Sequence, residues 1–244
     1  MANHPLMGHL VLGYPDLPTS RATAAAYAEA GLRFLELQIP FSHPTADGPL
    51  ITEANRQAVA NGTTLEDCRA VLADLADRYP ATERITMTYA NPVVHLGAAA
   101  FVAALAEVGV TGLIVPDLAL ESPVAEGLWG HPTLRPIPVV GPNTTPERLA
   151  RLLALGPRYV YCMSGYKLTG TGFSLDARLG GLVAQCHGAG AEVGIGFGID
   201  SRAAVAAVLA IADFAIVGSA LLRAQAAGQL HQVLAELTGA GHPA

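Results

Sequence analysis

The sequence of 244 residues contains almost no lysine, few cysteines and no long run of apolar residues. Lys167 is the only lysine among 14 basic side chains, and the net charge is −6. Binding to a nucleic-acid backbone needs clustered cations, and a membrane-spanning helix needs roughly 18 apolar residues in succession. We therefore expect neither nucleic-acid binding nor a membrane span.

Cysteine is also scarce. Cys68, Cys162 and Cys186 are far apart and form no CxxC pair, so we expect reduced thiols and no metal site. Residues 1–7 lack the basic segment followed by an apolar segment that marks a secretory signal. These absences favour a cytoplasmic protein.

What the chain does contain is apolar material spread evenly along its length. Hydrophobic residues make up 51% of the sequence and charged residues 14%, which suits a well-buried core. No linker or change of composition divides the chain. We expect one domain over residues 1–244.

Short apolar runs rich in β-branched residues alternate with Ala/Leu-rich amphipathic stretches. Strands are expected at 8–12, 33–39, 85–89, 112–116, 136–140, 158–163, 193–197 and 213–217. Helices are expected at 20–30, 50–60, 65–78, 98–107, 146–154, 176–188, 201–210 and 219–237. Eight such units favour a closed (β/α)₈ barrel of the TIM type, an α/β fold, over an open doubly wound sheet.

Functional residues of such barrels lie at the carboxyl ends of the strands. In the second expected strand Leu35, Leu37 and Ile39 alternate with Glu36 and Gln38. The apolar face should meet the helices, so Glu36 and Gln38 should point into the barrel. A buried carboxylate is costly unless it is paired or used, which makes Glu36 a candidate acid–base group, although a structural hydrogen-bonded carboxylate fits the pattern too.

The segment 39–49 that follows this strand is too long for a simple turn and contains three prolines. It indicates a shaped functional loop. Asp47 lies in this loop just before Gly48 and Pro49. From the residues alone, Asp47 is either a turn or helix-cap residue or a functional carboxylate.

Glycines cluster in three later loops, at 165–172, 196–198 and 218–219. Barrel enzymes commonly bind a phosphate there, on backbone N–H groups and a helix N-terminus. One glycine pair alone often serves only a tight turn. Three together predict a phosphate site.

Several motifs carry a family likeness over almost the whole chain. They are Glu36-Leu37-x-Ile39-Pro40-Phe41-Ser42-x-Pro44-x-Ala46-Asp47-Gly48-Pro49, Met87-x-Tyr89-x-Asn91-Pro92, Pro116-Asp117-Leu118, Tyr161-x-x-Ser164 with Thr169-Gly170, Gly196-Phe197-Gly198-Ile199 and Gly218-Ser219-Ala220. With them the chain resembles the alpha subunit of tryptophan synthase and the stand-alone indole-3-glycerol-phosphate lyases.

The resemblance implies a retro-aldol cleavage of indole-3-glycerol phosphate, a phosphorylated indole substrate, to indole and glyceraldehyde 3-phosphate, without a cofactor. Glu36 would protonate indole C3 and take the glycerol hydroxyl proton, Asp47 would bind the indole N–H, and Tyr161 would line the site. The other residues that the resemblance places at the substrate or its phosphate are Tyr89, Thr169, Gly170, Phe197, Gly198, Gly218 and Ser219.

The chain departs from this family pattern at several points. The short helix that usually precedes the first strand is missing. On the surface that meets the beta subunit in the family, His43 replaces an acidic residue and Ala119 replaces a proline. We therefore doubt a partnership with a beta subunit and expect a free-standing lyase. Gln38 replaces glycine and should narrow or re-polarise the pocket. Lys167 replaces a small loop residue. Three interpretations of this lysine are open: it faces solvent, it contacts the phosphate or the substrate, or it is a Schiff-base nucleophile.

Two alternative functions remain open. Gln38 and Lys167 fit a lyase or aldolase for a related phosphorylated substrate with a modified pocket. A catalytically idle alpha-like regulator of a synthase partner is the other alternative, although the presence of both Glu36 and Asp47 argues against it.

Overall fold

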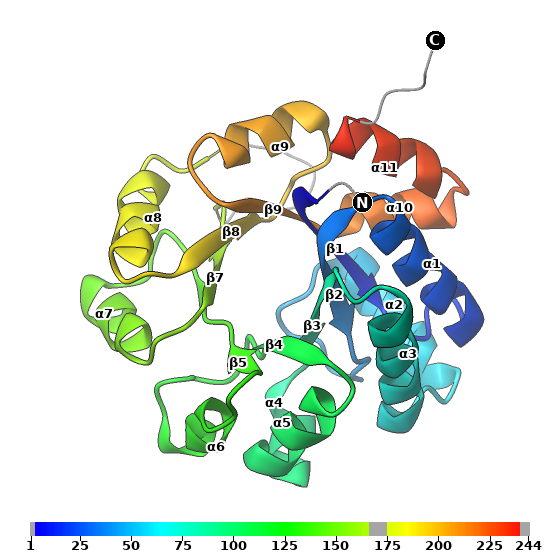
Figure 1. Ribbon diagram of the computed structural model, residues 1–244, viewed down its shortest axis with the longest axis horizontal. Coiled ribbons are helices and arrows are strands. Elements are labelled where there is room, and N and C mark those ends of the chain that lie inside the picture. The colour runs from blue at the N-terminus through cyan, green and yellow to red at the C-terminus, as the bar shows by residue number, and fades with distance from the viewer. Residues whose placement is uncertain (1–2, 166–174, 240–244) are drawn as a thin grey trace.

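The strands form a ring of parallel strands surrounded by helices (Figure 1). The computed structural model describes residues 3–165 and 175–239. Its sheet has the order β5-β4-β3-β2-β1-β9-β8-β7-β6. The strands are β1 (His4–Val11), β2 (Leu32–Gln38), β3 (Glu83–Met87), β4 (Val110–Ile114), β5 (Arg135–Pro136), β6 (Val139–Val140), β7 (Tyr159–Met163), β8 (Glu192–Gly196) and β9 (Phe214–Val217).

The segment from β5 to β6 closes the ring. β5 pairs with β4, whereas β6 pairs with β7. Between these pairs, Ile137 N donates to Leu113 O at 2.8 Å and Tyr161 N donates to Pro138 O at 2.9 Å. The two short strands therefore occupy one position of the barrel, and the expected eight-position TIM barrel is confirmed.

Helices cover the outside of the barrel. They are α1 (Leu17–Glu29), α2 (Pro49–Ala60), α3 (Leu65–Arg78), α4 (Ala90–Leu96), α5 (Ala98–Ala106), η1 (Pro123–Ala125), α6 (Glu126–Trp129), α7 (Pro146–Ala154), α8 (Leu179–Gly188), α9 (Arg202–Leu209), α10 (Ser219–Ala226) and α11 (Leu230–Thr238). Within residues 3–165 and 175–239, no helix precedes β1. None of the helices in these ranges is long and apolar enough to cross a membrane.

The sequence expectations for two segments were wrong. The strand expected at 136–140 is divided, because Pro138 has no N–H for the ladder. The helix expected at 219–237 is two helices, because Gly228 adopts a left-handed backbone with φ 69° after α10. The short helices α4 and α6 were not expected at all.

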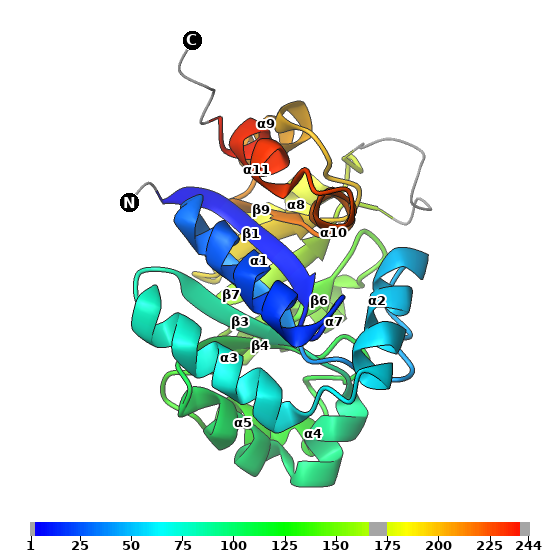
Figure 2. The same cartoon turned by 90° about the vertical axis from the view of Figure 1, so that its right-hand side faces the viewer.

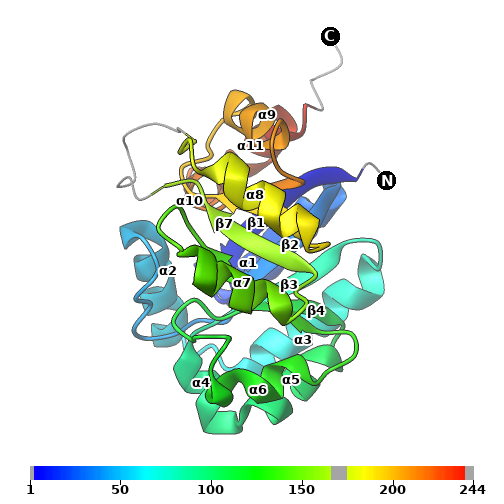
Figure 3. The same ribbon diagram turned by 90° about the vertical axis from the view of Figure 1, so that its left-hand side faces the viewer.

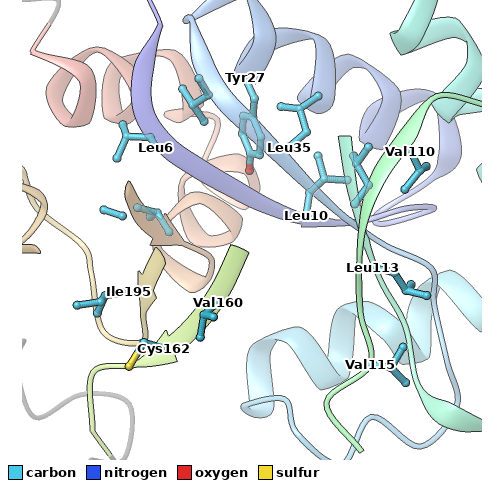
Figure 4. Close-up of a cluster of buried hydrophobic side chains, with 14 of the residues drawn as sticks. Leu6, Leu10, Tyr27, Leu35, Val110, Leu113, Val115, Val160, Cys162 and Ile195 are labelled. Carbon is cyan, nitrogen blue, oxygen red and sulfur yellow. The ribbon is translucent and has the colours of Figure 1, made fainter. Parts of the chain in front are cut away.

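Two apolar layers hold the barrel together. The outer layer fills the space between strands and helices, and Figure 4 shows part of it, including Leu10, Tyr27 and Leu35. The inner layer contains Met7, Phe34 and other inward side chains of the strands. Since β2 sends Leu35 outward and Phe34 inward, its alternation has the predicted direction.

Charged side chains gather at the amino-terminal end of the barrel. Arg33 donates to both carboxylate oxygens of Glu192, at 2.6 and 3.0 Å, and its guanidinium lies 4.5 Å from the ring centre of Phe34. Glu83 accepts a hydrogen bond from Tyr159 at 2.8 Å and lies 4.0 Å from Arg33. These contacts connect β2, β3, β7 and β8 and seal this end of the barrel.

We expect Arg33→Met to lower the free energy of unfolding by about 2 kcal/mol, because two charge-assisted hydrogen bonds are lost. Urea denaturation measures this change. Arg56→Met is the matched control, since Arg56 pairs with Glu53 on an exposed helix face, and it should leave the midpoint unchanged. Equal midpoints for both variants would show that the Arg33 cluster does not stabilise the barrel.

The opposite end is the mouth of the barrel. Figure 2 shows β1 pointing toward the side on which α2 lies. Figure 3 shows the other flank, where α7 and α8 lie beside β7. Because all strands are parallel, the segments that follow β2, β3, β7, β8 and β9 start at this mouth.

Candidate active site

Glu36 lies inside the barrel, as predicted, and is only 5% exposed. Its strand neighbour is His9, which pairs with it in the β1–β2 register. The His9 Nδ1 lies 3.4 Å from Glu36 Oε1, and His9 is itself 4% exposed. The carboxylate is therefore paired with a buried imidazole.

Asp47 lies in the loop between β2 and α2, and its Oδ2 collects hydrogen bonds. Gln38 Nε2 donates at 2.8 Å, the Tyr89 hydroxyl at 2.8 Å and Asn55 Nδ2 at 3.5 Å. Among the described residues, Asp47 Oδ1 accepts no hydrogen bond. That oxygen remains available for a ligand, which favours a functional role for Asp47 over that of a simple helix cap.

The pKa of Asp47 is raised above its ordinary value. Burial is the main cause, and the nearby charge of Glu36 acts in the same direction. His9, Gln38 and Tyr89 lower the pKa but do not cancel the shift. Gln38, which donates to Asp47, lies two residues after Glu36 on β2, and His9 lies 3.4 Å from Glu36, so the three groups share one site at the mouth.

The loop that carries Asp47 is held in place by polar contacts with α2 and the end of β3. Phe41 N donates to Asn55 Oδ1 at 3.0 Å, and Ala46 N donates to the Tyr89 hydroxyl at 3.2 Å. The Phe41 and Tyr89 rings stack with centres 5.4 Å apart. Tyr89 therefore positions the loop and Asp47 together.

Tyr161 reaches across the barrel from β7 toward the two carboxylates. Burial raises its pKa well above the ordinary value, and Glu36 and Asp47 raise it further. Its ring occupies the space beside Gly196, where a Cβ atom would lie 2.7 Å from the ring carbon Cζ and would also collide with the hydroxyl. Gly196 is thus required for the placement of Tyr161.

We expect Gly196→Ala to lower kcat by about tenfold, because a displaced Tyr161 would disturb the site. Steady-state kinetics measures this effect. Gly181→Ala on α8 is the matched control, since a Cβ at Gly181 meets nothing within 4 Å. Unchanged kinetics in Gly196→Ala would mean that Tyr161 has no role in turnover.

Phe197 and Gly198 follow β8 at the mouth, and both adopt positive φ angles, 78° and 77°. This conformation is strained for phenylalanine and is typical of functional loops. Ser164 maintains it, since its N–H donates to Gly196 O at 2.9 Å and its hydroxyl donates to Phe197 O at 2.8 Å. The exposed Phe197 ring meets the Tyr161 ring edge to face, with centres 6.3 Å apart.

Gly218 and Ser219 begin α10 directly after β9. The backbone N–H groups of a first helical turn have no partner within the helix and favour an anion. A Cβ atom added at Gly218 would lie 3.6 Å from the Cβ of His9, so this helix start lies next to His9. The expected phosphate position is therefore adjacent to His9.

The structure brings together most of the predicted site residues. Lys167, Thr169 and Gly170 lie outside the described residues, so their roles remain predictions. His9 and Asn55 also belong to this site, and neither was predicted from the sequence. His9 alternates with Leu10 and Leu12 in the strand expected at 8–12, and its position on the face opposite these leucines was the available signal.

No group of three or more His, Cys, Asp or Glu side chains that could hold a metal ion occurs in the described parts of the chain. The chemistry available at the mouth is that of two carboxylates, an imidazole and a phenol. Such groups transfer protons and stabilise developing charge.

Comparisons with known proteins converge on one family. A family model described as tryptophan synthase alpha chain matches residues 2–240. The tryptophan synthase alpha chain of Syntrophotalea carbinolica is 38% identical over 226 residues, which cover 89% of this chain and 87% of that protein. That of Leifsonia xyli subsp. xyli is 39% identical over 225 residues, which cover 91% and 86%. A structure of Mycobacterium tuberculosis tryptophan synthase is 34% identical, with a TM-score of 0.87 over 97% of this chain and 92% of that one.

Proposed function

The chain belongs to the tryptophan synthase alpha-chain family, and we propose that it cleaves indole-3-glycerol phosphate with Glu36 and Asp47 as its two working carboxylates. It is a carbon–carbon lyase whose products are indole and glyceraldehyde 3-phosphate. The observation that carries the residue assignment is the hydrogen bond from Gln38 Nε2 to Asp47 Oδ2 at 2.8 Å, because Gln38 lies two residues after Glu36 on the same face of β2.

Glu36 moves the protons in this proposal. It gives a proton to indole C3 and takes the proton of the glycerol hydroxyl next to the bond that breaks. As that bond breaks, its electron pair returns to the indole ring and the hydroxyl carbon becomes the aldehyde. The net result is the transfer of one proton from the hydroxyl to C3.

Asp47 binds the indole N–H through Oδ1, the oxygen without a partner among the described residues. Protonation at C3 places positive charge on the ring nitrogen, and a fixed carboxylate stabilises that charge. Gln38, Tyr89 and Asn55 hold Oδ2, so Oδ1 has a defined direction.

The phosphate group is assigned to the backbone N–H groups at Gly198, Gly218 and Ser219. The glycine conformation after β8 and the start of α10 support this assignment. Tyr161 and Phe197, whose rings are in contact, would line the indole side of the pocket.

Incubation of the purified chain alone with indole-3-glycerol phosphate tests the function. Indole should appear in proportion to enzyme, and no release at micromolar enzyme would contradict the proposal. The alternative of a related phosphorylated substrate predicts turnover of that compound in preference to indole-3-glycerol phosphate. An idle regulator predicts no turnover of either.

A tryptophan synthase beta chain is the candidate partner of this protein. The relatives are named as alpha chains, so the doubt about partnership gains no support from them. Val94, Leu96 and Val124 are exposed apolar residues on segments that follow β3 and β4, and they offer a contact surface. Stimulation of indole release by an added tryptophan synthase beta chain would support pairing, and its absence would support free-standing action.

We place the reaction in the cytoplasm. Cys68, Cys162 and Cys186 are all free and buried, which suits a reducing compartment.

A further inference from the structure

A second titratable group, His9, faces Glu36 inside the barrel. Its Nδ1 lies 3.4 Å from Glu36 Oε1, and the two residues are direct neighbours across β1 and β2. Neither side chain reaches the outer surface of the barrel, since both residues are buried. The ring therefore acts on the carboxylate at short range and with little screening by solvent.

His9 is also connected to the second carboxylate. Gln38 lies on the strand next to His9 and raises the pKa of His9, which favours the imidazolium form. The same side chain donates through Nε2 to Asp47 Oδ2 at 2.8 Å. Among the described residues, His9 Nε2 and Gln38 Oε1 are both buried without a hydrogen-bond partner. A ring N–H and an amide oxygen are a complementary donor and acceptor. The mouth of the barrel thus contains one group of neighbouring polar side chains, formed by Glu36, His9, Gln38 and Asp47.

We propose that His9 is a positioning residue of the lyase, which as an imidazolium holds Glu36 in the carboxylate form and in the orientation needed to take the hydroxyl proton. This inference rests on the proposed function. It adds a positive charge to a site whose other ionisable groups, within the described part of the chain, are acidic. The imidazolium balances the charge of Glu36 during the part of the cycle in which Glu36 has given up its proton.

The charged groups around His9 support the imidazolium form. Glu36 comes from β2 and Asp47 from the loop after it, while the backbone of Gly218 lies on the other side, after β9. From α1, Tyr27 donates its hydroxyl to the His9 carbonyl oxygen at 3.2 Å. Tyr161 of β7 faces the same two carboxylates.

The sign of the pH dependence follows from these neighbours. Burial lowers the pKa of His9, but Glu36 and Asp47, helped by Gln38, outweigh burial and raise the pKa above the ordinary 6.5. The imidazolium is therefore present below this raised pKa and is lost as the pH rises through it. Activity that depends on His9 should decline on the alkaline side.

The test compares His9→Phe and His9→Asn with the wild type, with kcat and KM measured from about pH 5.5 to 9.5. His9→Phe keeps a ring but removes the charge and the donor. We expect its kcat to fall about tenfold with KM nearly unchanged, and its alkaline decline to disappear. His9→Asn keeps a side-chain donor without the charge, so it should recover part of kcat while the alkaline decline stays absent. A folded His9→Phe variant with wild-type kcat and pH profile would overturn the proposal.

Nuclear magnetic resonance of ¹⁵N-histidine gives a readout that does not require substrate. The His9 signal, identified by its loss in His9→Asn, should titrate above pH 6.5 in the wild type and at lower pH in Glu36→Gln. If the His9 signal titrates at the same pH in Glu36→Gln as in the wild type, the proposal is refuted, even if His9→Phe does not fold. If the wild type shows this coupling but releases no indole, the proposed function fails while the His9–Glu36 pair stands.

Discussion

Glu36→Gln is expected to lower kcat for indole release by about 10³-fold, equivalent to about 4 kcal/mol of transition-state stabilisation. Glutamine fits the same buried space and can still accept a hydrogen bond from His9. It cannot take the hydroxyl proton or deliver one to C3. KM should change little, because the substrate's phosphate and indole contacts remain.

The matched control for this substitution is Glu66→Gln. Glu66 is exposed on α3 and pairs with Arg69, so its loss should leave kinetics unchanged. Thermal unfolding of both variants checks the fold. Wild-type kcat in a folded Glu36→Gln variant would assign the proton transfer to another group.

Asp47→Asn is expected to lower kcat by about 10²-fold. Three donors surround the Oδ2 position, namely Gln38 Nε2, the Tyr89 hydroxyl and Asn55 Nδ2. The amide oxygen of asparagine should take that position, which turns its NH₂ toward the indole N–H. Both the negative charge and the acceptor are then lost at the place where the ring nitrogen becomes positive.

Asp74→Asn provides the comparison, because Asp74 binds Arg21 and Arg78 on the outside of the barrel. Its kinetics should match those of the wild type. If Asp47→Asn also matched the wild type, Asp47 would be a loop anchor held by Tyr89 and Asn55 rather than a binding group for indole.

The direction of Glu36 was predictable because strand alternation is local. A shift of the strand by one residue would turn Glu36 outward and Leu35 inward. Because the face that carries Leu35 is purely apolar and packs against the helices, Glu36 had to point inward. The partner of Glu36 was not predictable in the same way. His9 meets it only through the register of β1 and β2, which depends on the packing of two separate strands.

The hydrogen-bond partners of Asp47 were even harder to predict from the sequence than the partner of Glu36. Its loop contains ordinary turn residues, and the three donors on Oδ2 come from β2, α2 and the end of β3. No local pattern connects these segments. The family resemblance supplied a role for Asp47, whereas the structure supplies the physical reason for its direction.

Prolines explain where the strand prediction was least accurate. The segment 136–140 has the apolar character of a strand, but Pro136 and Pro138 cannot donate to a ladder. The remaining donors are divided between two neighbours, β4 and β7. The amino-acid composition of this segment does not predict the division, which follows from the way the segment closes the ring of strands.

The most direct measurement is the cleavage of indole-3-glycerol phosphate by the purified chain in D₂O, followed by nuclear magnetic resonance. We expect equal amounts of indole and glyceraldehyde 3-phosphate, with deuterium at indole C3, and almost no product with Glu36→Gln. Unequal products, indole without deuterium at C3, or a Glu36→Gln variant as active as the wild type would contradict it.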